Sequence, residues 1–173
     1  MSGIPKLETE RLILRGHRPE DLEAYHRLWC DQGVTRFTSR TSMNREQAWS
    51  RIMQFHGMWK LCGYGMWVVE EKATNSLIGE VGLLERRREI QPSLDGTIEA
   101  GWMLLPRVHG QGFAQEAMEA VFSWAGQTYP GAVFSCIIDV ENEASLKLAR
   151  RLGFTETIQT TYQDHPTVIL RRG

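Results

Sequence analysis

The stretch RVHGQGFAQEAM (107–118) sets two glycines, Gly110 and Gly112, just before a segment with helical spacing. Glycine lacks a Cβ, so the backbone there adopts conformations closed to other residues and a ligand can approach the main chain. The first amides of a helix have no partner within the helix and carry partial positive charge, which suits an anion. From these residues alone, an anion-binding loop and an ordinary tight turn both remain open.

The segments on either side of this stretch predict a βαβ unit. TIEAGWMLL (97–105) is typical of a strand, and AVFSCIIDV (132–140) is a nearly unbroken apolar run, typical of a strand covered on both faces. Such a unit has parallel strands and binds ligands at the N-terminus of its crossover helix, where the glycines lie. One face of that helix carries apolar residues at regular spacing: Ala114, Ala117, Met118, Val121, Phe122 and Ala125.

The rest of the chain predicts further strands and helices around this unit. We expect strands at 11–17, 64–71, 77–85, 155–163 and 167–172, and helices at 18–30, 44–62 and 142–154. The order is βααβββ, then αβα, then ββ. In the helix 44–62, one stripe is expected to face the core: Trp49, Ile52, Met53 and His56.

Two connections carry charged or turn-forming residues. The basic run within 85–96 is interpreted as a solvated face, the usual role of short charge runs. The segment 164–166 is expected to form the tight turn of the last hairpin.

Composition and charge limit the classes of protein that the chain can be. Its 173 residues carry 20 basic and 21 acidic side chains, a formal net charge of −1. No global field therefore draws it to nucleic acid or anionic lipid, and we expect neither as a partner. The three cysteines lack metal-site spacing, and no run approaches the ~20 apolar residues of a membrane span. We predict one cytoplasmic domain, 1–173, without a metal.

Two familiar phosphate-binding motifs do not fit the glycine stretch. A Walker loop needs Gly-Lys-Ser/Thr after the second glycine, and this chain has Gly112-Phe113-Ala114. A dinucleotide fingerprint needs a third glycine or alanine where Gln115 stands, and it prefers a first strand near the start of its domain.

The same stretch resembles the GNAT superfamily of acyl-CoA-dependent N-acyltransferases. Residues 107–114 match its Q/R-x-x-G-x-G/A motif. Further segments are similar to the branch with the ribosomal-protein N-terminal acetyltransferases, namely ETERLILRGHRPEDLEAYHRL, IGEVGL, IEAGWMLLP, GFAQEAM and NEASLKLARRLGF. The resemblance covers essentially the whole chain. It implies an α+β fold, layered α/β/α, with a twisted mixed sheet whose fourth and fifth strands, 97–105 and 132–140, splay apart.

The resemblance also implies acetyl-CoA as cosubstrate, with its pantetheine in the gap between the splayed strands. Gly101 is expected to form a strand bulge that opens the sheet. The residues implied in cofactor binding are main-chain contacts at Met103, Leu104 and Leu105, the pyrophosphate loop Arg107, Val108, His109, Gly110, Gln111, Gly112, Phe113 and Ala114, and the fifth strand's exit at Asn142 and Ser145. Arg151 is a further candidate contact of the CoA phosphates, and its alternative, which is the stronger for any single residue, is a cation placed near a helix C-terminus by the helix dipole.

Transfer from a thioester to an amine needs a proton acceptor for the amine and a stabiliser for the leaving thiolate. Glu99 occupies the position of a glutamate credited as general base in several relatives, although a strand carboxylate has ordinary structural roles too. Many relatives protonate the thiolate with a tyrosine where this chain has Ala149. Ser145 is the expected substitute, and a purely local role at the helix start is its alternative.

Two functions therefore follow as expectations. The first is an N-acetyltransferase acting directly on a primary amine, either a peptide N-terminus or a small amine, in a ternary complex. The second is a non-catalytic acyl-CoA-binding or sensing module, which the missing tyrosine favours. The acceptor site is expected to be bordered by 32–43, 85–96 and 163–166. The sequence leaves the oligomeric state open, including a homodimer.

Overall fold

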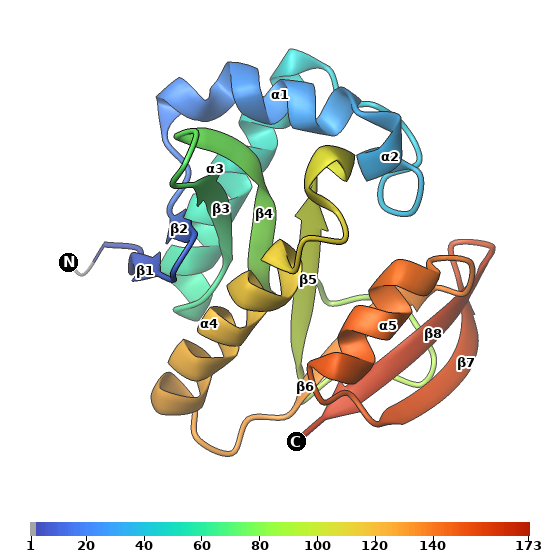
Figure 1. Cartoon of the computed structure of the whole chain (residues 1–173). Helices are drawn as coiled ribbons and strands as arrows, with labels where there is room; N and C mark the ends of the chain where they lie inside the picture. The colour runs from blue at the N-terminus through green and yellow to red at the C-terminus, as the bar shows by residue number, and fades with distance from the viewer. Residues whose placement is uncertain (1–2) are drawn as a thin grey trace.

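The computed structural model describes residues 3–173, which build a mixed eight-stranded sheet with helices on both faces (Figure 1). The strand order is β1-β2-β3-β4-β5-β6-β8-β7. Within this sheet β5 and β6 pair in parallel, and the other neighbours pair antiparallel. The strands are β1 (Leu7–Glu8), β2 (Leu12–Arg15), β3 (Met66–Glu71), β4 (Ser76–Leu84), β5 (Ile98–Leu104), β6 (Phe134–Asp139), β7 (Glu156–Tyr162) and β8 (His165–Arg172).

The helices follow the predicted order, with short additions. They are η1 (Pro19–Asp21), α1 (Leu22–Cys30), α2 (Gln32–Thr35), α3 (Arg45–Cys62), η2 (Pro106–Val108), α4 (Phe113–Thr128) and α5 (Glu143–Arg151), where η marks a 3-10 helix. The predicted fold class is confirmed, as is the parallel βαβ unit of β5, α4 and β6. Neither β1 nor α2 was predicted, because each has four residues or fewer and is too short to show a periodic pattern.

Alternating strand residues send their side chains to two different helical layers. Met66, Leu84 and Met103 pack with the cluster formed by α1 and α3. Their neighbours on the other face, among them Leu83 and Ala100, pack with the cluster that contains α4 and α5. This is the expected α/β/α layering, and it gives the central strands two buried faces.

The buried stripe of α3 differs from the prediction. Trp49 and Met53 are 39% and 54% exposed, and His56 lies at the surface with its Nε2 2.8 Å from the carbonyl oxygen of His17. The buried residues are Ala48, Ile52, Phe55, Met58 and Trp59. Because α3 carries apolar side chains on adjacent stripes, helical spacing alone did not decide which one faces the sheet.

The final hairpin turns earlier than expected. Gln163 and Asp164 have φ of 50° and 64°, while His165 and Pro166 already pair within β8. Two-residue hairpin loops favour positive φ at both positions because that twist matches the strands. The predicted turn at 164–166 is therefore displaced toward the N-terminus.

The sheet opens between β5 and β6. These strands pair only at Ile98 with Phe134 and at Glu99 with Ser135, whereas β6 pairs with β8 along its whole length. The bulge expected at Gly101 is wrong, because β4 and β5 keep an unbroken register that sets Gly101 opposite Gly82. The splay arises on the other edge of β5, where β6 follows β8 and diverges.

Candidate active site

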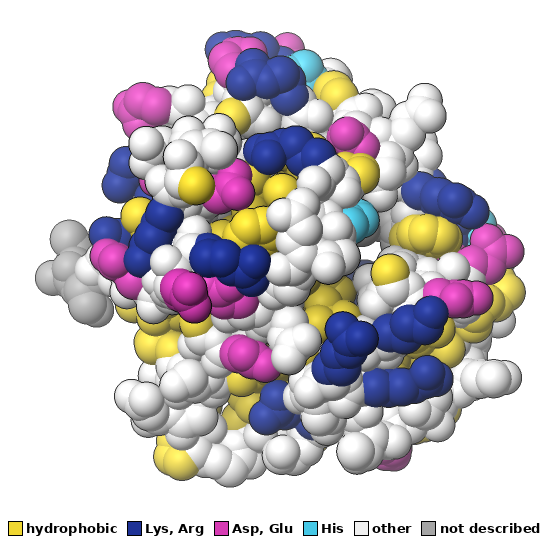
Figure 2. Space-filling model, viewed as in Figure 1, with side chains coloured by type: hydrophobic (Ala, Val, Ile, Leu, Met, Phe, Trp, Pro, Cys, Tyr) yellow, Lys and Arg dark blue, Asp and Glu magenta, His cyan; other side chains and the backbone are white. Residues whose placement is uncertain are grey.

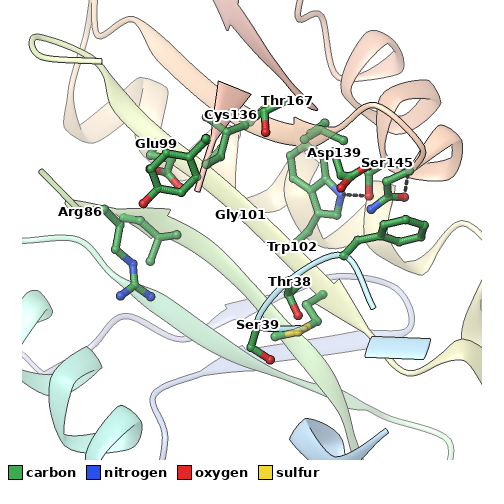
Figure 3. A pocket seen from close by; sticks show the side chains of 18 of the residues that line it. Thr38, Ser39, Arg86, Glu99, Gly101, Trp102, Cys136, Asp139, Ser145 and Thr167 are labelled. Carbon is green, nitrogen blue, oxygen red and sulfur yellow. Dashed lines mark hydrogen bonds between the residues drawn. The ribbon is translucent and has the colours of Figure 1, made fainter. Parts of the chain in front are cut away.

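A cavity of about 520 Å³ lies at the divergence of β5 and β6 (Figure 3). Its walls come from β4, β5 and β6, from the first turn of α5, and from side chains of α1 and α3. Trp102 and Ser145 line one side, while Glu80 and Arg86 line another. Because α5 and α1/α3 cover opposite faces of the sheet, the cavity connects the two faces through the splay.

The glycine stretch forms a cradle of free amides at the start of α4. Gly110 and Gly112 have φ of 74° and 80°, the left-handed region that favours glycine. Among residues 3–173, the five successive amides of 110–114 have no hydrogen-bond acceptor. Val108 and His109 were expected to contribute too, but their amides donate within η2 to Leu105 and Pro106, at 3.1 and 3.0 Å. Of the amides predicted to bind an anion, those of 110–114 are therefore the ones left free to do so.

An ion pair from the N-terminal segment holds this cradle in place. Arg11 Nη1 donates to the carbonyl oxygen of Gln111 at 2.9 Å, and its Nε donates to Glu116 in the first turn of α4 at 2.6 Å. Burial raises the pKa of Glu116, but the hydrogen bonds from Thr9 and Arg11 lower it by a larger amount, so the pKa lies below its ordinary value. Sequence reasoning missed Arg11, because its partners lie about a hundred positions along the chain.

The other residues predicted to contact the cofactor differ in how exposed they are. The side chains of Leu104 and Phe113 are buried, which leaves their main chain available, and Met103, 8% exposed, lines the cavity. His109 Nε2 lies 2.8 Å from the carbonyl oxygen of Leu104, which ties the loop to the end of β5. Arg107 is exposed and 3.9 Å from Glu71.

The basic side chains of α5 are spread along its solvent face. Figure 2 shows Lys and Arg side chains gathered over this helix, and Lys147, Arg150 and Arg151 are all exposed. Arg151 lies at the opposite end of α5 from Asn142 and lines a separate hollow beside Phe122. The structure therefore does not bring Arg151 to the cavity at the splay, and its contact with a phosphate stays a prediction.

Asn142 and Ser145 form the start of α5 at the cavity wall. The Asn142 side chain accepts a hydrogen bond from the amide of Ser145 at 3.2 Å, capping the helix. Trp102 Nε1 donates to Ser145 Oγ at 3.3 Å, from the opposite side of the splay. Because Oγ already accepts a hydrogen bond from Trp102, the hydroxyl proton is left to donate elsewhere.

Glu99 is 7% exposed and lies in a two-pronged ion pair. Arg88 Nε and Nη2 each donate to one carboxylate oxygen of Glu99 at 2.7 Å, and Arg88 Nη1 donates to the Tyr162 hydroxyl at 3.1 Å. Burial lowers the pKa of Arg88, while the bonds to Glu99 raise it by more. The interpretation of the 85–96 run as a solvated face is wrong for Arg88 and Arg86, which both line the cavity.

A second buried carboxylate lies deeper in the cavity wall. Glu80 is fully buried and accepts a hydrogen bond from the Tyr25 hydroxyl at 2.7 Å; His17 Nε2 lies 3.3 Å away and Arg51 Nη2 3.4 Å. Burial raises the pKa of Glu80, yet Arg51, His17 and Tyr25 together bring it below its ordinary value. Sequence reasoning missed this group because its members meet only in the folded chain.

Cys136 lines the cavity but is not an activated nucleophile. It is 1% exposed, and burial together with the charge of Glu99 raises the pKa of its thiol well above the ordinary value. A thiol in this state is protonated at neutral pH, and only the thiolate attacks a thioester readily.

Residues 3–173 contain neither a metal centre nor a membrane-spanning helix. No three His, Cys, Asp or Glu side chains gather within this range in a way that would hold a metal ion. None of its helices has the length and apolar character needed to cross a bilayer.

The comparisons with known proteins agree with this architecture. The acetyltransferase (GNAT) domain model matches residues 11–155. The uncharacterized N-acetyltransferase YoaA of Bacillus subtilis is 30% identical over 155 residues, which are 87% of this chain and 83% of that protein.

Solved structures match over nearly the full length. A protein of Bordetella pertussis named as a GNAT-family acetyltransferase has a TM-score of 0.87 at 26% identity, covering 98% of this chain and 99% of its own. The ribosomal-protein-S5-alanine acetyltransferase of Vibrio fischeri has a TM-score of 0.79 at 17% identity, covering 97% and 96%, and so shares the fold. With the family model spanning most of the sequence, the chain belongs to the GNAT acetyltransferases, a family of acyltransferase enzymes.

Proposed function

We propose that this enzyme binds acetyl-CoA at the start of α4 and passes the acetyl group directly to a primary amine. The observation that carries the proposal is the cavity through the splay, which joins the α5 face of the sheet to the α1/α3 face. The free amides of 110–114 suit the pyrophosphate, because helix-start amides solvate an anion without side-chain charge. The thioester then reaches the splay beside Trp102 and Ser145, and the amine enters from the other face.

The amine must lose a proton before it attacks. An α-amine has a pKa near ~8 and a lysine amine near ~10.4, so both are largely protonated at neutral pH. Glu99 is the proposed proton acceptor, directly or through water. Its two oxygens each accept one bond from Arg88, and each retains a second lone pair that can accept a further hydrogen bond.

Ser145 is proposed to stabilise the departing thiolate. Its hydroxyl proton is free because Trp102 already donates to Oγ. A covalent acyl-enzyme is not proposed, since the Cys136 thiol is buried and its pKa is raised. The reaction is therefore a direct transfer within a ternary complex: the amine nitrogen forms the amide bond as the carbon–sulfur bond breaks.

A second candidate function is a non-catalytic acyl-CoA-binding module. Two observations favour it: Ala149 replaces the usual tyrosine, and both oxygens of Glu99 are engaged by Arg88. Calorimetric titration with acetyl-CoA, followed by measurement of free CoA over a panel of peptides, amino acids and small amines, separates the two. Binding with amine-dependent CoA release supports the transferase. Binding without release on any amine supports the module.

A further inference from the structure

Within the described part of the chain, Arg86 is a cation in the cavity wall without a counter-ion. Its Nε is buried and has no hydrogen-bond partner among residues 3–173, and no carboxylate of these residues lies within salt-bridge distance. The guanidinium carbon of Arg86 lies 6.0 Å from the centroid of the Phe55 ring. A buried donor left unsatisfied is costly, and because Nε is closed to solvent, a ligand in the cavity can neutralise this guanidinium only through its terminal nitrogens.

The charges that line the cavity leave the same imbalance. Arg88 pairs with Glu99, Arg51 with Glu80, and Arg40 with Asp139, which matches three arginines to three carboxylates. Arg86 is the fourth arginine of the lining, and no lysine of residues 3–173 lines the cavity. Arg86 is thus the arginine of the lining that has no paired carboxylate, and an anionic group on the ligand would balance its charge.

The strand pattern aims Arg86 into the space next to the splay. Glu80, Leu84, Arg86 and Arg88 alternate along β4 and its continuation, and all four line the cavity. Opposite them on β5, Gly101 has no side chain, and a Cβ there would lie 3.1 Å from Leu84 Cδ1. In Figure 3, Gly101 separates Arg86 on one side from Ser145 on the other.

We propose that Arg86 binds a carboxylate on the acceptor, so that the substrate is an amine that also carries a carboxylate. The inference rests on the proposed acetyl transfer at this site. The guanidinium fork matches the two oxygens of a carboxylate, which accept parallel hydrogen bonds from it. Burial, together with repulsion from Arg51 and Arg88, lowers the pKa of Arg86 by more than attraction to Glu99 and Glu80 raises it, and a bound anion would offset the net effect.

Two kinds of acceptor could supply this carboxylate. It is either the α-carboxylate of a free amino acid or the side-chain carboxylate of an acidic residue in a peptide N-terminus. Two matched sets of acceptors distinguish them: free amino acids against the corresponding amino-acid amides, and C-terminally amidated dipeptides with Asp or Glu against those with Asn or Gln at the second position.

The test is steady-state CoA release by the full chain over these matched acceptors. We expect kcat/KM for the carboxylate-bearing member of at least one set to exceed that of its amide by about tenfold or more, the size of a charge-assisted hydrogen bond. Arg86→Met should bring this ratio close to one, and Arg86→Lys should keep part of it. Arg87→Met is the matched control, because the Arg87 side chain is 79% exposed and does not line the cavity.

A binding measurement separates failure of this inference from failure of the proposed transfer. N-acetyl amino acids and their amides resemble the product and can be titrated calorimetrically whether or not the chain turns over. If carboxylates bind more tightly than amides and Arg86→Met removes the difference, the Arg86 assignment holds even without CoA release. Equal binding and equal turnover of carboxylate and amide members would overturn it, as would a preference that survives in a folded Arg86→Met variant.

Discussion

At the scale of single residues, the bond between Trp102 and Ser145 fixes what the serine can do. Trp102 Nε1 can only donate, so Ser145 Oγ is the acceptor and its own proton stays available. Ala149 is fully buried and packs in the main core. A tyrosine ring there would have to displace core side chains, and Ser145 is the hydroxyl present at the start of α5.

Ser145→Ala should therefore slow the chemical step. One hydrogen bond to a sulfur that gains charge is worth ~1.5–3 kcal/mol, which corresponds to roughly 10- to 100-fold in rate. The measurement is the single-turnover rate of CoA release at saturating acetyl-CoA. Ser145→Thr keeps the hydroxyl and is the control. A wild-type rate in Ser145→Ala would leave the serine hydroxyl with the structural role of accepting the bond from Trp102.

Glu99→Gln separates catalysis from structure at the neighbouring position. If Glu99 accepts the amine proton, kcat/KM should fall by roughly 10²-fold or more, and the acidic limb of the pH–rate profile should flatten. If Glu99 only anchors Arg88, the variant loses stability while its pH profile keeps the wild-type shape. Acetyl-CoA affinity, measured by calorimetry, should change little in either case. Arg88→Lys, which keeps a positive charge beside Glu99, serves as the control for the ion pair.

At the scale of elements, the start of α4 depends on backbone conformation. Gly112 is the residue before the helix and has φ of 80°, and a Cβ there would meet Arg11 at an ordinary contact distance of 3.5 Å. The obstacle to a side chain is thus the left-handed conformation, which costs roughly 1–2 kcal/mol for an L-residue.

Gly112→Ala should lower the free energy of unfolding by about this amount and weaken acetyl-CoA binding, because a relaxed loop no longer aims its amides at one point. Gly126→Ala is the matched control. Gly126 lies inside the same helix, where an added Cβ would meet nothing within 4 Å, and alanine should stabilise the helix by about 0.5–1 kcal/mol. Urea denaturation with and without acetyl-CoA measures both effects. Equal behaviour of the two variants would count against the cradle.

Local patterns predicted most of the elements but little of the site's side-chain chemistry. The parallel unit of β5, α4 and β6 was predictable because its apolar periodicity and its glycines lie within short segments of the sequence. The α3 stripe was not, because tertiary packing chose between two apolar stripes. Arg88 pairs across 11 positions and Arg11 across 105, and a sequence pattern does not show such partners.

At the scale of the whole molecule, one opening in the sheet connects the two faces that the helical layers cover. The α4/α5 face supplies helix starts, which suit an anion. The α1/α3 face supplies buried charge, including Glu80 and Arg86. The splay of β5 and β6 is what joins them. A continuous parallel sheet would have kept the two faces apart.

Two buried carboxylates beside α1 make the fold sensitive to acid. Asp21 accepts bonds from both terminal nitrogens of Arg15, at 2.7 and 2.8 Å, and Glu80 lies among His17, Tyr25 and Arg51. Burial raises the pKa of each carboxyl, but the partners lower both pKa values below the ordinary 3.8 and 4.5. The folded state therefore binds fewer protons than the unfolded state in this range. The resulting stabilisation is complete above the unfolded pKa values and is lost as pH falls through the folded ones.

We therefore expect the free energy of unfolding to be nearly level from pH 7 to about 5, as far as these carboxyls contribute, and to fall steeply below the ordinary Glu value of 4.5. Asp21→Asn removes one titrating group, so its stability at neutral pH should be lower and its decline on acidification shallower. Glu46→Gln changes an exposed carboxylate on α3 and should leave the wild-type curve unaltered. Urea denaturation at half-unit pH steps measures all three proteins. An Asp21→Asn curve parallel to wild type would show that the Arg15–Asp21 pair does not couple folding to protonation.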